Sequence, residues 1–302
     1  MIKTNKNSGV NFKLVKIILA IAVGVVCFYQ IKKLNFNAIN TITSIHYLPL
    51  LFVFILVFPN YWTEYKKWEI ILRSVDRNVS VATKIQSFFA GIITGMITPN
   101  MQGNFIGRIY YFPRKIRLSI TLLTLTANLG QFCVTIILGI GALLLIGTNH
   151  MYVWLLPSLL VIITLIFYFR FENITFFREK VKWYKQIREL LQQHRSLRPN
   201  ILLLSLIRHF IFSLQFLLAL HAFGAEMNWH TYCLIWELYL WTTLSPSLIF
   251  GKLFVRESIA LWVFAGISLP EWNIVAASFS IWVINLLLPT LIGLFICKNQ
   301  IK

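Results

Sequence analysis

Two short stretches of this chain combine residue types that are unusual between apolar runs. In each, a hydroxyl residue precedes a proline, a glycine follows, and an arginine lies five residues beyond that glycine: Thr98, Pro99, Gly103 and Arg108 in the first, and Ser245, Pro246, Gly251 and Arg256 in the second. Proline frees a backbone carbonyl, and glycine tolerates unusual dihedral angles. A guanidinium can hold an anionic group such as a lipid phosphate. The repeated pattern therefore predicts two broken helices that form a binding site for an anion.

The bilayer limits where such breaks can lie. Unpaired backbone groups are costly in hydrocarbon, so broken helices persist only where they are buried in protein or line a wet cavity. Corresponding breaks in two halves of a chain indicate a transporter binding site. We predict a pseudo-repeat whose breaks meet near the midplane, with Arg108, Arg256 and Glu257 as the headgroup site. The alternative is that both breaks serve only packing, while the arginines snorkel to headgroups.

The composition supports a membrane location. The chain has 302 residues, is 58% hydrophobic and only 13% charged, and carries a formal net charge of +18. A soluble domain would have about a quarter of its residues charged. The Lys and Arg residues lie between apolar runs, which favours a positive-inside bias over nucleic-acid binding. We expect one integral membrane domain over residues 1–302, with anionic lipid headgroups as partners.

The apolar runs predict an all-α polytopic protein with about six spanning helices plus the two broken segments. Four runs fit one helix each, 14–31, 45–62, 200–223 and 272–297. The run 118–169 has no Lys, Arg, Asp or Glu and is long enough for two, with a turn at 147–150. Aromatic residues at the end of the second run predict an interfacial belt, namely Tyr61, Trp62, Tyr65 and Trp68.

The basic residues predict the orientation. They gather at the N-terminus, at 63–84, at 108–117, at 170–198 and at the C-terminus, which places all these parts and both termini in the cytoplasm. The segment 85–107 has basic clusters on both sides, so we predict a re-entrant hairpin that turns near Pro99–Gly103. The region 231–269 is either a matching hairpin or two short crossings, and charge counting does not separate them.

The connection 170–198 has its own pattern. Apolar residues recur there at helical spacing among Lys and Arg residues. This is typical of an amphipathic basic helix that lies on the inner leaflet. A partner-binding segment is the alternative.

Glu237, in "LIWELYLW", is a predicted intramembrane carboxylate. A charge at that depth needs a partner or a cavity, and Arg208 and His209 are the candidate partners. A structural ion pair and a proton or substrate relay both stay open. For Glu257, local pairing with Arg256 and coupling to a cation or proton also stay open.

The chain shows no sign of catalytic or metal chemistry. It has no HExxH, GxSxG or P-loop pattern, and its four cysteines lie singly in apolar runs. We expect no catalytic residues, no metal and no cofactor, and a protein that is not an enzyme.

Three longer stretches carry a family resemblance. "WTEYKKWEIIL", "GIITGMITPNMQGNFIGR" and "SPSLIFGKLFVRESIALWVFAGISLPEWNIVAA" resemble the flippase-like membrane region of the lysylphosphatidylglycerol synthase family, in the same order over nearly the whole chain. The resemblance implies a protein of the cytoplasmic membrane of a bacterium or archaeon. It also implies an activity that moves, or helps to move, a charged or glycosylated lipid between leaflets.

The chain departs from the family pattern at both motifs. The family's first motif usually has an acidic residue after its glycine, where this chain has Asn104. The second motif is usually glycine-rich before its Arg-Glu pair, whereas "SPSLIFGKLFVRE" is bulkier and keeps Arg256-Glu257. Aminoacyl transfer would need a further domain, so we do not expect this chain to be the synthase by itself.

Two other functions stay open. One is a membrane enzyme, or its accessory subunit, that acts on lipid-linked sugars with Glu237 or Glu257 as acid or base. The other is a structural partner of a lipid-modifying enzyme, with no transport of its own.

Overall fold

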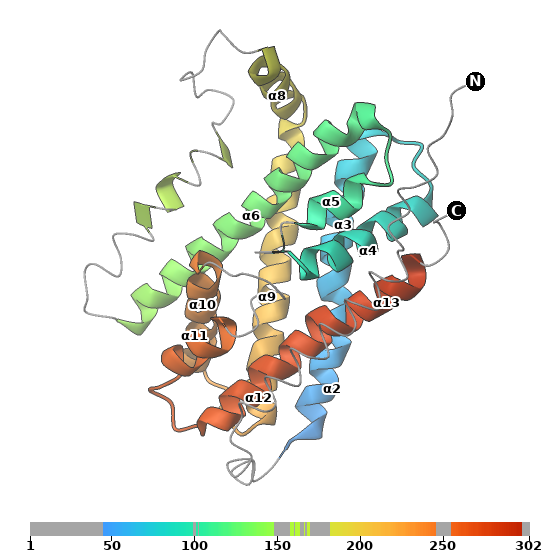
Figure 1. Cartoon of the computed structure of the whole chain (residues 1–302). Helices are drawn as coiled ribbons and strands as arrows, with labels where there is room; N and C mark the ends of the chain where they lie inside the picture. Colours follow the sequence, from blue (N-terminus) through green and yellow to red (C-terminus); the bar gives the residue numbers. More distant parts are fainter. Residues whose placement is uncertain are drawn as a thin grey trace. The chain divides into compact units, whose positions relative to one another are not determined.

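The computed structural model describes residues 45–98, 101, 103–147, 158–159, 161–163, 166, 168–169, 182–245 and 255–297. The chain divides into two compact units, Met1–Thr43 and Ser44–Lys302, and the structure below belongs to the second. Its described part is helical, without a strand (Figure 1).

The helices before residue 150 are α2 (Tyr47–Ile55), α3 (Val57–Val75), α4 (Val81–Met96), α5 (Gly103–Ile109) and α6 (Arg114–Ile146). After it come α8 (Lys182–Gln193), η4 (Arg195–Leu197), α9 (Arg198–Ala222), α10 (Trp229–Leu244), α11 (Val255–Val263), α12 (Glu271–Trp282), η5 (Val283–Leu287) and α13 (Leu288–Ile296).

Four helical stretches are long and apolar enough to cross a membrane. They are Tyr47–Val75, Arg114–Ile146, Arg195–Ala222 and Glu271–Ile296, and they correspond to four of the predicted spans. The predicted span 14–31 lies outside the described residues, and the one after the turn at 147–150 is described only in part. The all-helical membrane architecture is therefore confirmed, while the count of about six stays a prediction.

The helix α3 continues through the predicted interfacial and cytoplasmic residues as far as Val75. Trp68 was assigned to an interfacial belt, and this prediction is wrong: its side chain is fully buried. Its indole Nε1 donates to the Lys84 carbonyl oxygen and to Ser87 Oγ, each at 3.2 Å. It packs with Ile71 and Phe88 in the core cluster. Packing of α4 and α6 against α3 encloses this face.

The first interrupted region is a helical hairpin in which α4 and α5 lie against each other (Figure 1). Each arm carries a Gly-x-x-x-Gly pattern, "GIITG" at 91–95 and "GNFIG" at 103–107, which permits close helix approach. A Cβ on Gly107 would overlap the Ala90 carbonyl oxygen and the Thr94 hydroxyl. Thr94 Oγ1 donates to the Gly103 carbonyl oxygen at 2.6 Å, so the arms are also joined by a hydrogen bond. The predicted hairpin is present, and its entry into the membrane stays a prediction.

The turn of this hairpin is described only in part. Thr98 Oγ1 accepts a hydrogen bond of 2.6 Å from the Gly103 backbone N–H, which caps the start of α5. Met101 has a φ of 56°, in the left-handed region. Pro99 lies outside the described residues.

The second interrupted region also has two helices in contact, α10 and α11 (Figure 1). Pro246 and Gly251 lie outside the described residues between them. The choice between a hairpin and two short crossings stays open.

The predicted amphipathic segment 170–198 contains α8. On its apolar side Leu191 is buried and Leu190 packs against the core cluster. The Lys185 and Glu189 side chains are exposed. Residues 170–181 lie outside the described part, and contact with the inner leaflet stays a prediction.

The hairpin geometry makes a first prediction. Gly107→Ala should lower the free energy of unfolding by about 1–3 kcal/mol, because the added methyl group meets the α4 backbone at Ala90, which cannot move aside cheaply. The matched control is Gly141→Ala on α6, where a Cβ meets nothing within 4 Å. That change should be neutral or stabilising. Thermal unfolding of the detergent-purified protein measures both, and equal melting temperatures would contradict the packing.

Candidate functional site

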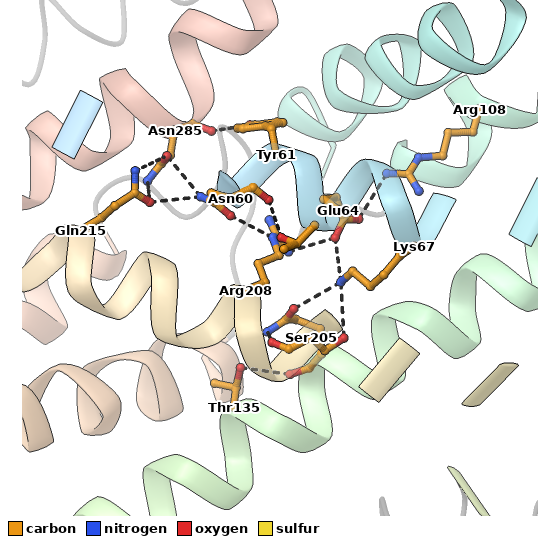
Figure 2. Close-up of polar contacts among 12 residues, drawn as sticks. Asn60, Tyr61, Glu64, Lys67, Arg108, Thr135, Ser205, Arg208, Gln215 and Asn285 are labelled. Atoms are coloured by element: carbon orange, nitrogen blue, oxygen red, sulfur yellow. Dashed lines mark hydrogen bonds and ion pairs between the residues drawn. The ribbon is translucent and has the colours of Figure 1, made fainter. Parts of the chain in front are cut away.

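A buried ionic cluster is centred on Glu64 of α3 (Figure 2). Glu64 Oε2 lies 2.7 Å from Lys67 Nζ and 3.2 Å from Arg208 Nη1. Glu64 Oε1 lies 3.3 Å from Arg108 Nη2. Because Arg108 is on α5 and Arg208 is on α9, a single carboxylate connects three helices that are far apart in the sequence.

This cluster carries an excess of positive charge. The Arg108 and Lys67 side chains are only 2% and 3% exposed, Glu64 is 13% exposed and Arg208 is 27% exposed. In the part of the chain that the structure describes, Glu64 is the sole acid that pairs with these three cations, so three positive charges and one negative charge leave a surplus of two. A buried charge without a counter-charge is costly. The cluster is therefore suited to an anion from outside the chain.

Neutral side chains extend the cluster on two sides. Lys67 Nζ also donates to Gln131 Oε1 at 3.3 Å and to Ser205 Oγ at 3.4 Å. On the other side, Arg208 Nε donates to Asn60 Oδ1 at 3.1 Å. These contacts fix the two cations from α6 and α9 as well as from α3, so their positions do not depend on Glu64 alone.

Asn60 joins the cluster to the last membrane-length helix. Its Nδ2 donates to Gln215 Oε1 at 3.2 Å and to Asn285 Oδ1 at 3.3 Å. The Tyr61 hydroxyl donates to the Asn285 carbonyl oxygen at 2.5 Å. Asn285 lies in η5, a π-helical turn, and such turns free backbone groups and often mark functional sites. The polar network thus runs through α3, α9 and η5 (Figure 2).

Arg108 has further binding capacity. Its guanidinium lies over the rings of Trp68 and Phe88, at 4.9 and 5.3 Å from their centroids. Among the described residues, its buried Nε has no hydrogen-bond partner, and neither has the buried Oδ1 of Asn104 one turn earlier. A Cβ on Gly91 would come within 2.5 Å of that Asn104 oxygen and 2.7 Å of Arg108 Cγ. Three of the predicted site residues, Gly103, Asn104 and Arg108, therefore lie together on α5, and Gly91 on α4 leaves room for the side chains of Asn104 and Arg108.

The second predicted arginine is in a different, neutral cluster. Arg256 Nη2 donates to Glu257 Oε1 at 3.1 Å and to the Ser278 carbonyl oxygen at 2.6 Å. Arg256 Nε donates to Ser278 Oγ at 2.9 Å, and this hydroxyl donates to Glu257 Oε1 at 2.9 Å. Local pairing, one of the two alternatives for Glu257, is what these contacts show. The prediction that Arg256 and Arg108 share one hydrated chamber stays a prediction.

Among the described residues, Glu237 forms no hydrogen bond or ion pair with Arg208 or His209, its two candidate partners. Its Oε1 accepts from Trp241 Nε1 at 3.1 Å, one turn along α10. Arg208 points to Glu64 and Asn60 on α3, and His209 Nδ1 lies 3.3 Å from Thr135 Oγ1. The expected pairing was wrong because adjacent residues on α9 face different neighbours.

Two residues of the central cluster were missed in the sequence. Lys67 was assigned to a cytoplasmic basic connection and Glu64 was given no role, although α3 passes straight through this region. The available signal was the Glu-x-x-Lys spacing within "WTEYKKWEIIL", which places the two charges on one helix face, among aromatic residues. Arg208 was considered only as a partner of Glu237.

Together the membrane-length helices and the buried polar network define a multi-pass membrane protein with a basic cluster inside its helix packing. The family model described as "Lysylphosphatidylglycerol synthase TM region" matches residues 16–293, so the chain belongs to this family. Membership connects the protein with membrane lipids. Neither the curated proteins nor the solved structures include one that matches this chain.

The charge balance makes a second prediction. Glu64→Gln should lower the free energy of unfolding by about 3–5 kcal/mol, because it removes the counter-charge of three buried cations. Glu189→Gln is the control, because this carboxylate is 63% exposed and lies 3.9 Å from Lys185, whose side chain is 82% exposed. The control change should lower the free energy of unfolding by less than about 1 kcal/mol. Thermal unfolding in neutral detergent compares the two, and equal losses would contradict the central role of Glu64.

Proposed function

We propose that this protein is a flippase-like lipid transporter that moves, or helps to move, a lipid with an anionic headgroup between leaflets. The Glu64 cluster is its headgroup site. The observation that carries the proposal is the surplus of two positive charges around Glu64, on side chains that are mostly buried. Membership in a family named for a lipid synthase membrane region supports a lipid as the ligand.

The chemistry of the cations suits a phosphate or carboxylate. Arg108 and Arg208 supply planar guanidinium groups that can bind two oxygens at once, whereas Lys67 supplies a point charge. In the described part of the chain the Nε of Arg108 has no acceptor, which leaves it to donate to a ligand. An entering headgroup would compete with Glu64 for both arginines, whose contacts are longer than the 2.7 Å contact of Lys67.

This competition gives a physical basis for movement. Glu64 connects α5 and α9 to α3 through ion pairs. A bound anion would take over these pairs and loosen the direct link between the helices.

A specific observation favours a second function. Glu257 Oε2 is buried and has no hydrogen-bond partner among the residues that the structure describes, which is what a carboxylate acting as acid or base in a membrane enzyme would offer. Formation of product from a lipid-linked sugar, without lipid exchange, would support this alternative.

Leaflet exchange tests the favoured function. Purified protein in liposomes that contain fluorescent phosphatidylglycerol or phosphatidylcholine should expose inner-leaflet label to dithionite, faster for the anionic lipid. Arg108→Gln and Arg208→Gln should each slow this exchange about tenfold or more, because each removes a charge-assisted hydrogen bond.

The matched control is Lys115→Gln, which removes one positive charge at an exposed site. Its exchange rate should stay within about twofold of the wild-type rate. Exchange that does not depend on Arg108 or Arg208, or that is absent from the wild type, would contradict the proposal.

A further inference from the structure

A hollow lies where α3 ends beside the first turns of α4 and the short helix η4, and its lining includes no residue of the Glu64 cluster. It has a volume of about 680 Å³ and is lined by Ile70, Arg73, Ser74, Arg77, Lys84 and Leu197. Half of this lining is cationic and two of the other residues are aliphatic. We refer to these six residues as the rim hollow.

The charges of the rim hollow are held in place but not neutralised. Glu69 Oε1 lies 2.9 Å from Arg73 Nη2 and 3.8 Å from Lys84 Nζ. Glu69 thus pairs with two of the three lining cations, and one negative charge against three positive charges leaves a surplus of two. Lys66 and Asp76 nearby add one charge of each sign and do not change that surplus.

Hydrogen bonds to backbone carbonyl oxygens hold the helices that line the rim hollow. The Lys84 carbonyl oxygen accepts from Trp68 Nε1 at 3.2 Å, and the Lys84 side chain is only 9% exposed. The Ser74 carbonyl oxygen lies 3.3 Å from His194 Nε2, which connects the end of α3 with the segment before η4. Lys84 is therefore a mostly buried cation on a fixed backbone rather than a freely moving surface lysine.

The rim hollow lies on the same helix as the central cluster. Lys67, Ile70 and Ser74 are spaced three and four residues apart on α3, so they share one face. The ten residues from Glu64 to Ser74 correspond to about 15 Å along the helix axis. A lipid bound at the rim hollow would therefore have its headgroup within about 15 Å of the Glu64 carboxylate.

We propose that the rim hollow binds the phosphate-bearing headgroup of a membrane lipid, as a surface site distinct from the Glu64 cluster. Three cations suit the phosphate oxygens. The aliphatic side chains of Ile70 and Leu197 suit the adjoining glycerol and acyl carbons, which a free phosphate ion lacks. This assignment rests on the residues of the rim hollow alone, and it does not require that the protein exchange lipids between leaflets.

Binding of a short-chain lipid tests the assignment without transport. Dihexanoyl phosphatidylglycerol is titrated into the full-length protein in neutral detergent, and heat is measured. All proteins carry Arg208→Gln, so that lipid binding at the central cluster contributes less to the measured heat. Adding R73Q/R77Q should weaken binding about tenfold or more.

The matched control adds R114Q/K115Q, which removes two exposed positive charges at the start of α6. It should leave the affinity within about twofold. Equal losses in the two variants would overturn the proposal, because the effect would then be one of overall charge. If Arg208→Gln does not give monodisperse protein, the same two variants are compared in the wild type, where R73Q/R77Q should remove one binding site and unchanged stoichiometry would overturn the proposal.

Two further probes identify the source of the phosphate. Inorganic phosphate at the same concentration should not displace the lipid, and full displacement would overturn the lipid assignment in favour of a free anion. Loss of rim binding in R73Q/R77Q would support this site even if leaflet exchange were absent, so the two proposals can fail separately.

Discussion

The carboxylate of Glu64 is the group on which the rest of this structure depends. It is the shared partner of Lys67, Arg108 and Arg208, and thereby joins α3, α5 and α9. Removing cations from water is costly, and one carboxylate offsets only part of that cost. The amide and hydroxyl groups around it position the cations but add no charge. The fold thus maintains a deficit of negative charge that an anionic headgroup can supply.

The two interrupted regions have similar sequence patterns but different electrostatics. In the first, the packed glycines of α4 and α5 bring Arg108 against the aromatic rings of α3 and α4 and next to Glu64. In the second, Arg256 is neutralised by the adjacent Glu257 and held by Ser278. A pseudo-repeat therefore need not present two equal sites. Among the described residues, the surplus positive charge lies around Glu64, beside Arg108 of the first region, and this asymmetry is the reason for proposing the headgroup site there.

Much of the architecture follows from hydrophobic pattern alone, because length and apolarity decide which segments can span a bilayer. Four membrane-length helices agree with such reasoning. The α4–α5 hairpin was predicted from the basic clusters on both sides of it, and the place of Arg108 in a polar cluster from the broken motif. The positions of Lys67 and Trp68 do not agree with the sequence pattern, because a local pattern cannot distinguish an interfacial helix end from one that neighbouring helices enclose. The pairing of Arg208 with Glu64 joins residues 144 positions apart, and only tertiary packing determines it. Pairing rules within one helix could have singled out Glu64 and Lys67.

The most direct test of the central claim is an experimental density map of the protein in nanodiscs that contain phosphatidylglycerol. The account predicts headgroup density within ion-pair distance of Lys67, Arg108 and Arg208, with at least one arginine displaced from Glu64. Should the map instead show the three cations closed on Glu64 alone, with lipid density only at the protein periphery, the claim that their surplus charge serves an anionic headgroup would be contradicted.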